Sequence, residues 1–153
     1  MKLPTTILLT LTICLTAFAW EPSQDFLNYM KRVEGFRGNV YVCAGGYRTI
    51  GYGHQIKAGE AFGTLSEKAA TELLKTDLRA FYGLVESRYG RLDNSQTEMF
   101  LDFYFNLGSM RAFPKMERAI LSHDGHSMRR EYKRYVHGME LGRNKHFAKY
   151  FQL

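Results

Sequence analysis

One short part of this chain, residues 38 to 53, has the pattern of β-strands, and helical patterns lie on both sides of it. Two runs rich in β-branched and aromatic residues flank the pair Gly45-Gly46, which indicates a β-hairpin. Gly51 and Gly53 follow, and their lack of a side chain lets the backbone approach another group closely. The sequence therefore predicts an α+β fold in which the strands occupy only a small lobe.

Helical spacing of apolar residues characterises most of the remaining chain. Ahead of the hairpin, Ser23 is expected to cap a helix that ends at about Glu34, where Gly35 stops it. After the hairpin, a helix of roughly 35 Å is predicted between Ser66 and Tyr89. Its apolar stripe is expected to comprise Leu73, Leu74, Leu78, Phe81, Leu84 and Val85.

Shorter helices complete the predicted architecture, in which the long helix joins the small hairpin lobe to a larger all-helical lobe. A cleft between two such lobes is a natural site for an extended polymer. At 153 residues the chain suits one domain of this kind and is long enough to bury a core. The shorter helices are expected at residues 94–106, 113–122, 127–136 and 143–151.

The chain is basic, with 21 Lys and Arg against 15 Asp and Glu and a net charge of +6, which favours polyanionic partners. Basic residues gather between Met128 and Arg134, but Glu131 lies among them and no nucleic-acid-binding motif accompanies them. Nucleic acid is therefore disfavoured, and residues 129–134 are expected to form a solvated helix face that leans toward anionic cell wall. The five histidines show no metal-ligand spacing, so neither a metal nor another cofactor is expected.

The N-terminus has the features of an export segment. A positive start at Lys2 precedes an uncharged stretch up to Trp20, and Ala17-Phe18-Ala19 fits a signal-peptidase site. Two interpretations remain for residues 1–19: a cleaved secretory signal, or a weakly hydrophobic anchor that holds the protein transiently at the inner membrane and is later released. Both place the domain of residues 20–153 outside the cytoplasm, in the periplasm or the extracellular space.

Glu34 is the first candidate for chemistry. It is expected in the last turn of its helix, where unpaired carbonyls carry partial negative charge. That field, together with burial, disfavours the carboxylate and raises its pKa toward the range that a general acid needs. A glutamate at a helix end is an ordinary surface charge in most proteins, so its position alone does not identify a catalytic acid.

The segment that begins at Glu34 carries a more specific pattern. Eight residues separate Glu34 from Cys43, five separate Cys43 from Thr49, and the run Gly51-Tyr52-Gly53-His54 follows. This segment resembles the active-site segment of the phage-type lysozymes, glycoside hydrolase family 24, which have Glu, Asp or Cys, and Thr at this spacing. The resemblance continues in Leu73-Leu74-Lys75-Thr76-Asp77-Leu78, in Phe103-Tyr104-Phe105-Asn106-Leu107-Gly108 and, more loosely, from Leu141 to Phe151.

The resemblance implies a lysozyme-like, two-lobed fold in a monomer that hydrolyses peptidoglycan. The bond cut would be the β-1,4 bond between N-acetylmuramic acid and N-acetylglucosamine, and Glu34 would protonate the leaving oxygen. Cys43 would stabilise the developing positive charge or handle the attacking water, and Thr49 would help to hold that water. The residues expected to contact the sugar chain are Tyr52, Gly53 and Asn106.

The resemblance also implies roles for residues outside this chemistry. His54 and Asp77 are expected to form an ion pair between the hairpin and the long helix. Arg143 corresponds to a basic residue that orients the catalytic glutamate. Tyr52 is expected to stack on a sugar ring, and Asn106 to lie at the floor of the cleft.

Cys43 stands where most relatives carry Asp. A thiolate can replace a carboxylate electrostatically and is a good nucleophile, and Arg37 or Arg48 is expected to lower its pKa. Some membrane-tethered phage endolysins are similar in having Cys here, and they use its redox state to control activity. A disulfide between Cys14 and Cys43, the two cysteines of the chain, is therefore a hypothesis. Such relatives usually carry a third cysteine for exchange, and this chain has none.

Three interpretations from different classes remain: an active muramidase, a lysozyme-fold protein that binds glycan without cutting it, and a basic protein that acts on membranes through charge. The replacement of Asp by Cys43 motivates the second. The mixed charges of the late helices disfavour the third. The sequence leaves open a phage, prophage or bacterial origin, and whether Cys43 acts as base or nucleophile, which decides between inversion and retention.

Overall fold

The computed structural model describes residues 20–153. The expected export segment, its cleavage site and Cys14 fall within residues 1–19 and lie outside the described residues. Among residues 20–153, none of the helices combines the length and the apolar character needed to span a bilayer.

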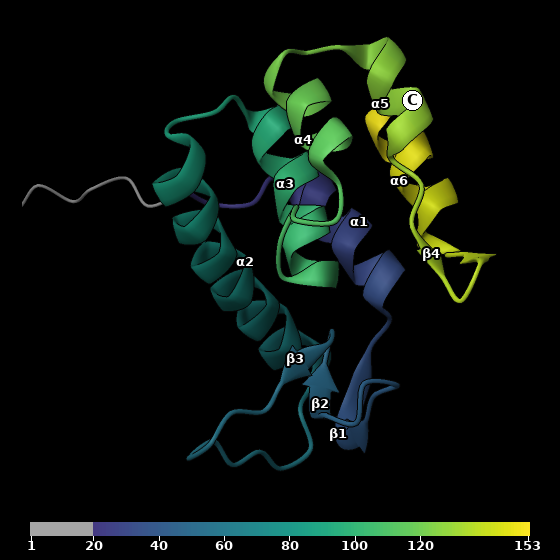
Figure 1. Cartoon of the computed structure of the whole chain (residues 1–153). Coiled ribbons are helices and arrows are strands. Elements are labelled where there is room, and N and C mark those ends of the chain that lie inside the picture. The colour runs from purple at the N-terminus through teal and green to yellow at the C-terminus, as the bar shows by residue number, and fades with distance from the viewer. Residues whose placement is uncertain (1–19) are drawn as a thin grey trace, which may run out of the picture.

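The chain folds into two lobes joined by a long helix (Figure 1). A three-stranded antiparallel sheet forms the smaller lobe and helices form the larger one, which confirms the predicted α+β fold. In Figure 1 the sheet lies at the bottom, and α2 runs upward from it along the left of the helical lobe. The elements are α1 (Gln24–Glu34), β1 (Arg37–Val42), β2 (Arg48–Gly51), β3 (His54–Gln55), α2 (Glu67–Tyr89), α3 (Asn94–Leu107), α4 (Pro114–Leu121), α5 (Gly125–Glu131), β4 (Tyr135–Val136), β5 (Met139–Glu140) and α6 (Arg143–Phe151).

Polar caps and glycines fix the ends of the helices that carry the site. The hydroxyls of Ser23 and Ser66 accept hydrogen bonds from backbone N–H groups in the first turns of α1 and α2, as the sequence predicts. α3 begins with a capping box between Asp93 and Gln96. α1 ends at Gly35, whose φ of 71° is a conformation that favours glycine.

The predicted hairpin is confirmed. β2 pairs with β1 on one side and with β3 on the other, both antiparallel. A tight turn joins β1 to β2, because the N–H of Gly46 donates to the carbonyl of Cys43 and the N–H of Cys43 donates to the carbonyl of Tyr47, both at 2.9 Å. The pairing register shifts between Arg37 and Tyr41, and such an irregularity bends the strand where it leaves α1.

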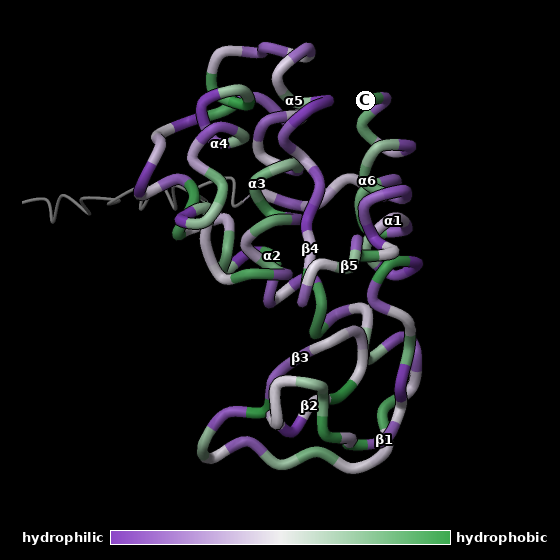
Figure 2. The backbone as a smooth tube through the Cα atoms, turned by 45° about the vertical axis from the view of Figure 1, so that its right-hand side comes forward, coloured by the Kyte–Doolittle hydropathy of each residue, from purple (hydrophilic) through white to green (hydrophobic). Residues whose placement is uncertain are grey.

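Most of the apolar core belongs to the helical lobe and surrounds α3. Every residue of α3 from Met99 to Tyr104 is buried, so this helix is covered all around. It packs against α2 and α4. Helix α1 packs against α6, and these two helices lie side by side in Figures 1 and 2. Hydrophobic and hydrophilic segments alternate along the helices in Figure 2. The core includes the buried side chains of Phe26, Met30, Phe100, Phe103, Met110, Met116 and Phe147.

The segment from residue 127 to 136 differs from the predicted helix. α5 ends at Glu131, and the chain continues into an antiparallel hairpin of β4 and β5. The turn of this hairpin holds His137 and Gly138 at φ values of 51° and 78°, which a right-handed helix does not contain. The expectation that residues 129–134 form one solvated face is also wrong for Arg134, whose side chain is 1% exposed.

α2 departs from its predicted apolar stripe at one position. Leu74, Leu78 and Val85 are buried as expected, but Leu84 is 55% exposed. Leu84 lines an open cavity between the lobes, where the periodicity of a single helix gives no information on what covers it.

Candidate active site

Glu34, the last residue of α1, contacts both lobes. Its Oε1 accepts a hydrogen bond of 2.9 Å from Nη1 of Arg143, which comes from α6. Its Oε2 lies toward the sheet lobe, because a Cβ added at Gly53 would meet this oxygen at 3.5 Å. Gly53 has a φ of 92°, so its lack of a side chain serves both the backbone turn and the approach to Glu34.

The environment of Glu34 favours its protonated form. Burial raises the pKa of this carboxyl above its usual value, while the charge and the hydrogen bond of Arg143 act in the opposite direction without cancelling the effect. The carboxylate of Asp102 adds to the increase. A carboxyl that keeps its proton closer to neutral pH can act as a general acid.

Arg143 connects Glu34 to a second acid inside the helical lobe. Its other terminal nitrogen, Nη2, donates to Oδ1 of Asp102 at 2.7 Å. Asp102, on α3, is fully buried and also accepts hydrogen bonds from Arg134 at 2.6 Å and from the hydroxyl of Tyr29 at 2.7 Å. Burial disfavours the charge of Asp102, but the two arginines outweigh it and hold its pKa below the usual range.

The sequence predicts a role in the site for Glu34 and Arg143 but none for Asp102 or Arg134. Asp102 is the only charged residue between positions 99 and 105, and a lone acid within an apolar run signals burial with a partner. Arg134 offers no comparable signal, because it lies among basic residues that are mostly exposed.

Cys43 and Thr49 lie together where β1 turns into β2. The pKa of the Cys43 thiol is lowered, first by a hydrogen bond from the Thr49 side chain and next by one from the backbone of Tyr47. The Thr49 hydroxyl also lies 3.0 Å from the carbonyl oxygen of Tyr47, so its single hydrogen can go to either of two acceptors, one at a time. Among residues 20–153 the thiol has no sulfur partner.

Neither Arg37 nor Arg48, the arginines expected to lower the pKa of Cys43, is among the main causes of its decrease. Arg37 lies over the ring of Tyr41, with 4.6 Å between the guanidinium carbon and the ring centre. Burial raises the pKa of the Tyr41 phenol, Arg37 opposes this, and the charges of Cys43 and Glu34 both add to it. Cys43 and Glu34 are therefore both within electrostatic range of one side chain.

His54 joins the sheet to α2. Its Nδ1 lies 2.9 Å from Asp77, and its Nε2 lies 3.0 Å from Glu60. Burial raises the pKa of Asp77, and the hydrogen bond to His54 opposes this increase. Because both ring nitrogens of His54 are occupied by carboxylates, this buried group has the geometry of a structural contact between two elements.

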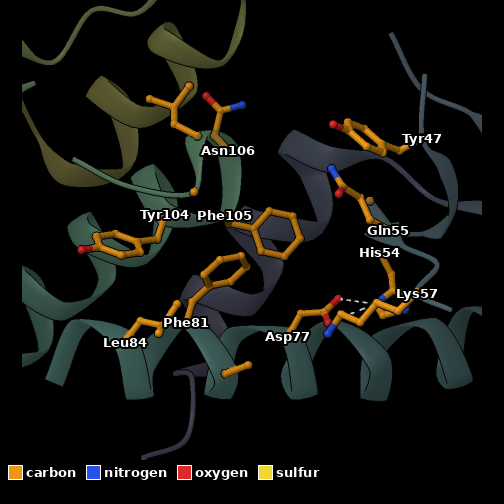
Figure 3. Close-up of a pocket in the computed structure, with 14 residues that line it drawn as sticks. Tyr47, His54, Gln55, Lys57, Asp77, Phe81, Leu84, Tyr104, Phe105 and Asn106 are labelled. Atoms are coloured by element: carbon orange, nitrogen blue, oxygen red, sulfur yellow. Dashed lines mark hydrogen bonds and ion pairs between the residues drawn. The ribbon is translucent and has the colours of Figure 1, made fainter. Parts of the chain in front are cut away.

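A cavity of about 660 Å³ lies between the sheet and helices α2 and α3 (Figure 3). Phe81 and Phe105 meet edge to face in its middle, with ring centres 5.8 Å apart. Gly53 lines the cavity, which brings it next to Glu34. Asn106 lines it as well, and within the described chain its Oδ1 is buried without a hydrogen-bond partner.

Tyr52 does not lie where the sequence analysis places it. Its ring is 3% exposed, its hydroxyl donates to Glu67 at 2.8 Å, and it packs against Phe36. The expectation that Tyr52 stacks on a sugar is therefore wrong, since a buried ring has no free face. Tyr47, which is 59% exposed and borders the cavity, presents an aromatic side chain instead.

The structure thus brings the remaining predicted residues together in pairs, and Glu34, Cys43 and Thr49 are not among the residues that line the cavity. In the part of the chain that the structure describes, no three His, Cys, Asp or Glu side chains form a metal-binding group. Asn106 and Gly53 share the cavity. The pairs are Glu34 with Gly53, Cys43 with Thr49, and His54 with Asp77.

Comparison with known proteins identifies a family and a fold. Residues 31–146 match the phage lysozyme family. The fold is similar to that of a point mutant of the lysozyme of phage P22, at a TM-score of 0.68 and 21% identity, over 88% of this chain and 99% of that one. No curated protein matches the chain.

Two further solved structures share the fold. The active form of the phage P1 endolysin Lyz is similar at a TM-score of 0.64 and 14% identity, over 86% of this chain and 83% of that one. The muramidase domain of SpmX from Asticaccaulis excentricus is similar at a TM-score of 0.62 and 20% identity, over 85% and 94%.

Proposed function

Because the chain belongs to the phage lysozyme family, we propose that it is a muramidase that hydrolyses the β-1,4 bond between N-acetylmuramic acid and N-acetylglucosamine in peptidoglycan. The observation that carries this proposal is Glu34, a largely buried carboxyl with a raised pKa beside a cavity between the lobes. Solved structures of the same fold are described as a lysozyme, an endolysin and a muramidase domain, which supports it.

In this proposal Glu34 donates its proton from Oε2 to the oxygen of the leaving sugar. Arg143 holds Oε1, so the proton resides on the other oxygen, which lies toward Gly53. Since Gly53 has no side chain, a sugar ring can come close to this oxygen. Protonation breaks the glycosidic bond and leaves positive charge on the sugar that remains, as in other glycosidases.

Cys43 is the proposed second group. A lowered pKa increases the fraction of thiolate, whose negative charge stabilises the positive sugar. Thr49, whose hydroxyl reaches both Cys43 and the Tyr47 carbonyl, would hold the attacking water. If Cys43 activates this water, the product inverts, and if it attacks the sugar itself, the product retains its configuration. NMR of the first product anomer distinguishes the two.

The cavity is the proposed binding site for the glycan chain. Tyr47 and Phe105 offer aromatic surface to sugar rings. Asn106 lines the cavity, and its buried Oδ1 lacks a partner in the described chain. A turn of the amide toward the cavity would let it accept an N–H from an acetamido group, which both sugars of peptidoglycan carry.

Other parts of the proposal concern stability and location. His54 and Asp77 also line the cavity, and they are proposed to hold β3 against α2 rather than to take part in catalysis. A peptidoglycan substrate lies in the periplasm or outside the cell, where residues 1–19 would deliver the protein as a signal or as a releasable inner-membrane anchor. We further propose that the protein works as a monomer and needs no cofactor.

The deciding experiment measures new reducing ends released from purified peptidoglycan by residues 20–153 under reducing conditions. Glu34→Gln is expected to lower the rate about a thousandfold, because it removes the acid while keeping the size of the side chain. Glu72→Gln changes an exposed glutamate on α2 in the same way and should keep full activity. Equal rates for Glu34→Gln and the parent would contradict the proposal.

A second candidate is a lysozyme-fold protein that binds peptidoglycan without cutting it, and Cys43 in place of Asp favours it. Sedimentation with insoluble peptidoglycan distinguishes the two. A folded, reduced protein that sediments with the polymer but releases no reducing ends supports the second candidate. If Cys43→Asp then gains activity, the substitution at this position is the cause.

A further inference from the structure

Asp102 is a fully buried acid surrounded by three hydrogen-bond donors. Its Oδ1 accepts from the hydroxyl of Tyr29 and from Nη2 of Arg143, each at 2.7 Å, and its Oδ2 accepts from Nη1 of Arg134 at 2.6 Å. These donors come from α1, from α6 and from the segment that precedes β4. Asp102, on α3, therefore ties three separate parts of the helical lobe to one carboxylate.

Arg134 depends on this carboxylate for its charge balance. Its guanidinium lies 4.3 Å from the ring centre of Phe103 and 4.9 Å from that of Phe147, and its side chain is 1% exposed. Within residues 20–153, its Nε and Nη2 have no hydrogen-bond partner. A buried cation needs a counter-ion, and Asp102 supplies it.

We propose that Asp102 and Arg134 are positioning residues, a buried ion pair that fixes the guanidinium of Arg143 and limits how much positive charge Glu34 faces. Neither residue lines the cavity, and neither takes part in the reaction proposed above. The inference rests on the proposed role of Glu34 as the acid and adds what tunes that acid.

The geometry of Arg143 explains how the pair acts. Its two terminal nitrogens are divided between Glu34 and Asp102, at 2.9 and 2.7 Å, so one guanidinium serves two carboxylates. Asp102 orients the guanidinium of Arg143 so that one of its N–H groups faces Oε1 of Glu34. The second oxygen of Glu34, Oε2, stays free for the proton. A guanidinium shared in this way stabilises the Glu34 carboxylate less than one devoted to it.

The direction of each effect follows from the charges. If Asp102 becomes neutral, Glu34 faces two uncompensated arginines, its carboxylate is favoured, and the acid loses its proton at lower pH. If Arg134 becomes neutral, the negative charge of Asp102 is less compensated, and Glu34 keeps its proton to higher pH. If both become neutral, the two effects oppose each other.

The groups that face Glu34 and Asp102 are few. Arg143 comes from α6, Arg134 from the segment before β4, Tyr29 from α1 and Tyr41 from β1. Burial raises the pKa of both phenols, so they stay neutral at the pH values of the test. Glu34 is therefore the group whose titration the variants change.

The experiment compares pH profiles of peptidoglycan cleavage for Asp102→Asn, Arg134→Met and the double variant. All are measured in a background that carries Cys43→Asp, which removes the titrating thiol, so that the alkaline limb reports loss of the proton from Glu34. This limb should move down by about one pH unit in Asp102→Asn and up by about one in Arg134→Met. The double variant should lie between Asp102→Asn and the parent, because Arg143 is then no longer shared with Asp102 while the charge of Arg134 is also gone. Limbs that stay in place, or that move in the same direction in both single variants, would overturn the inference.

The design keeps folding separate from the charge effect. Met fills the space of the Arg134 stem between Phe103 and Phe147, and the double variant leaves no unpaired charge at these two positions, so both remain informative if Asp102→Asn does not fold. Glu21→Gln and Arg79→Met make the same charge changes in an exposed ion pair. These controls should leave the alkaline limb in place, because solvent screens their charges.

A second readout does not depend on activity. The side-chain carboxyl carbon of Glu34, labelled with ¹³C and assigned through Glu34→Gln, titrates in the NMR spectrum. Its midpoint should move with the same signs in Asp102→Asn and Arg134→Met as the alkaline limb does. A folded parent without turnover contradicts the proposed function, whereas midpoints that do not move contradict the role of Asp102 and Arg134.

Discussion

On its helical side the candidate site is closed. Glu34 is held by Arg143, which is held by Asp102, and all three side chains are largely or fully buried. On its sheet side the site is open, because Cys43 lies in a turn and its lowered pKa comes from hydrogen bonds within the same hairpin. The environment of Glu34, the proposed proton donor, is thus set by residues that are distant in sequence, and that of Cys43, the proposed second group, is set by its immediate neighbours.

This difference shows how one site can combine a fixed acid with an adaptable partner. A buried ion-pair network holds its members in one arrangement, since each unpaired charge would be strongly unfavourable. A hydroxyl that serves two acceptors, such as that of Thr49, can turn between them during a reaction. Four measurements test whether the two sides differ in this way.

The largest expected effect is on stability. Asp102→Ala leaves Arg134 and Arg143 buried without their shared acceptor, so we expect the free energy of unfolding in urea to fall by about 3–5 kcal/mol. Glu21→Ala breaks the exposed pair with Arg79 and should lower it by at most about 1 kcal/mol. Similar losses in the two variants would remove the distinction between a closed network and a surface contact.

The next effect concerns the open side. Cys43→Ala removes the second group, and we expect the rate of peptidoglycan cleavage to fall about a hundredfold. Cys43→Asp supplies a carboxylate at the same place and should retain most of the rate. Melting temperatures should change little in both variants, because this side chain lies in a turn. A fully active Cys43→Ala would show that the sheet side contributes no chemical group.

A smaller effect isolates the hydroxyl of Thr49. Thr49→Val keeps the shape of the side chain but removes its hydrogen bond, so the pKa of Cys43 should rise. Alkylation by iodoacetamide at pH 7 should then slow about fivefold, as expected for one hydrogen bond. Thr64→Val, which removes a hydroxyl bonded to Asn39 in the same lobe, is the matched control. Equal slowing in both variants would point to a general change in the lobe.

The smallest effect is a trend with pH. Because the pKa of Glu34 is raised in the folded protein, its contribution to stability is present below the pKa of the unfolded chain and is lost as pH rises through the folded pKa. Glu34→Gln has no such proton to lose. Its melting temperature relative to the parent should therefore increase from about pH 4 toward neutral pH. A difference that stays constant with pH would show that the Glu34 site does not favour the protonated form.

The fold was predictable where local signals are strong. Gly45-Gly46 between two β-type runs marks the hairpin, and Ser23 and Ser66 mark helix starts. The hairpin of β4 and β5 was not, because its strands hold two residues each and the basic residues before it continue a helical spacing. Helical periodicity also cannot tell that Leu84 faces a cavity, since that depends on what α3 and the sheet leave uncovered.

The arrangement of the candidate site was predictable where its residues follow one another along the chain. Glu34, Cys43 and Thr49 lie within one segment, and that segment folds into one helix end and one hairpin. Asp102 and its partners were not predictable, because they are brought together across 32 and 41 positions by packing of the helical lobe. The prediction for Tyr52 is wrong for the same reason, since only the folded lobe shows that its ring is buried.

The contact between Arg143 and Glu34 spans 109 positions of the chain. During synthesis, Glu34 leaves the ribosome long before α6 exists, and parts that emerge early fold first. Through that interval α1 and the hairpin can form, but the cation that orients the acid has not yet been made. A nascent chain therefore carries an incomplete site for most of its synthesis, and a ribosome that stalls ahead of α6 yields a polypeptide without a positioned acid.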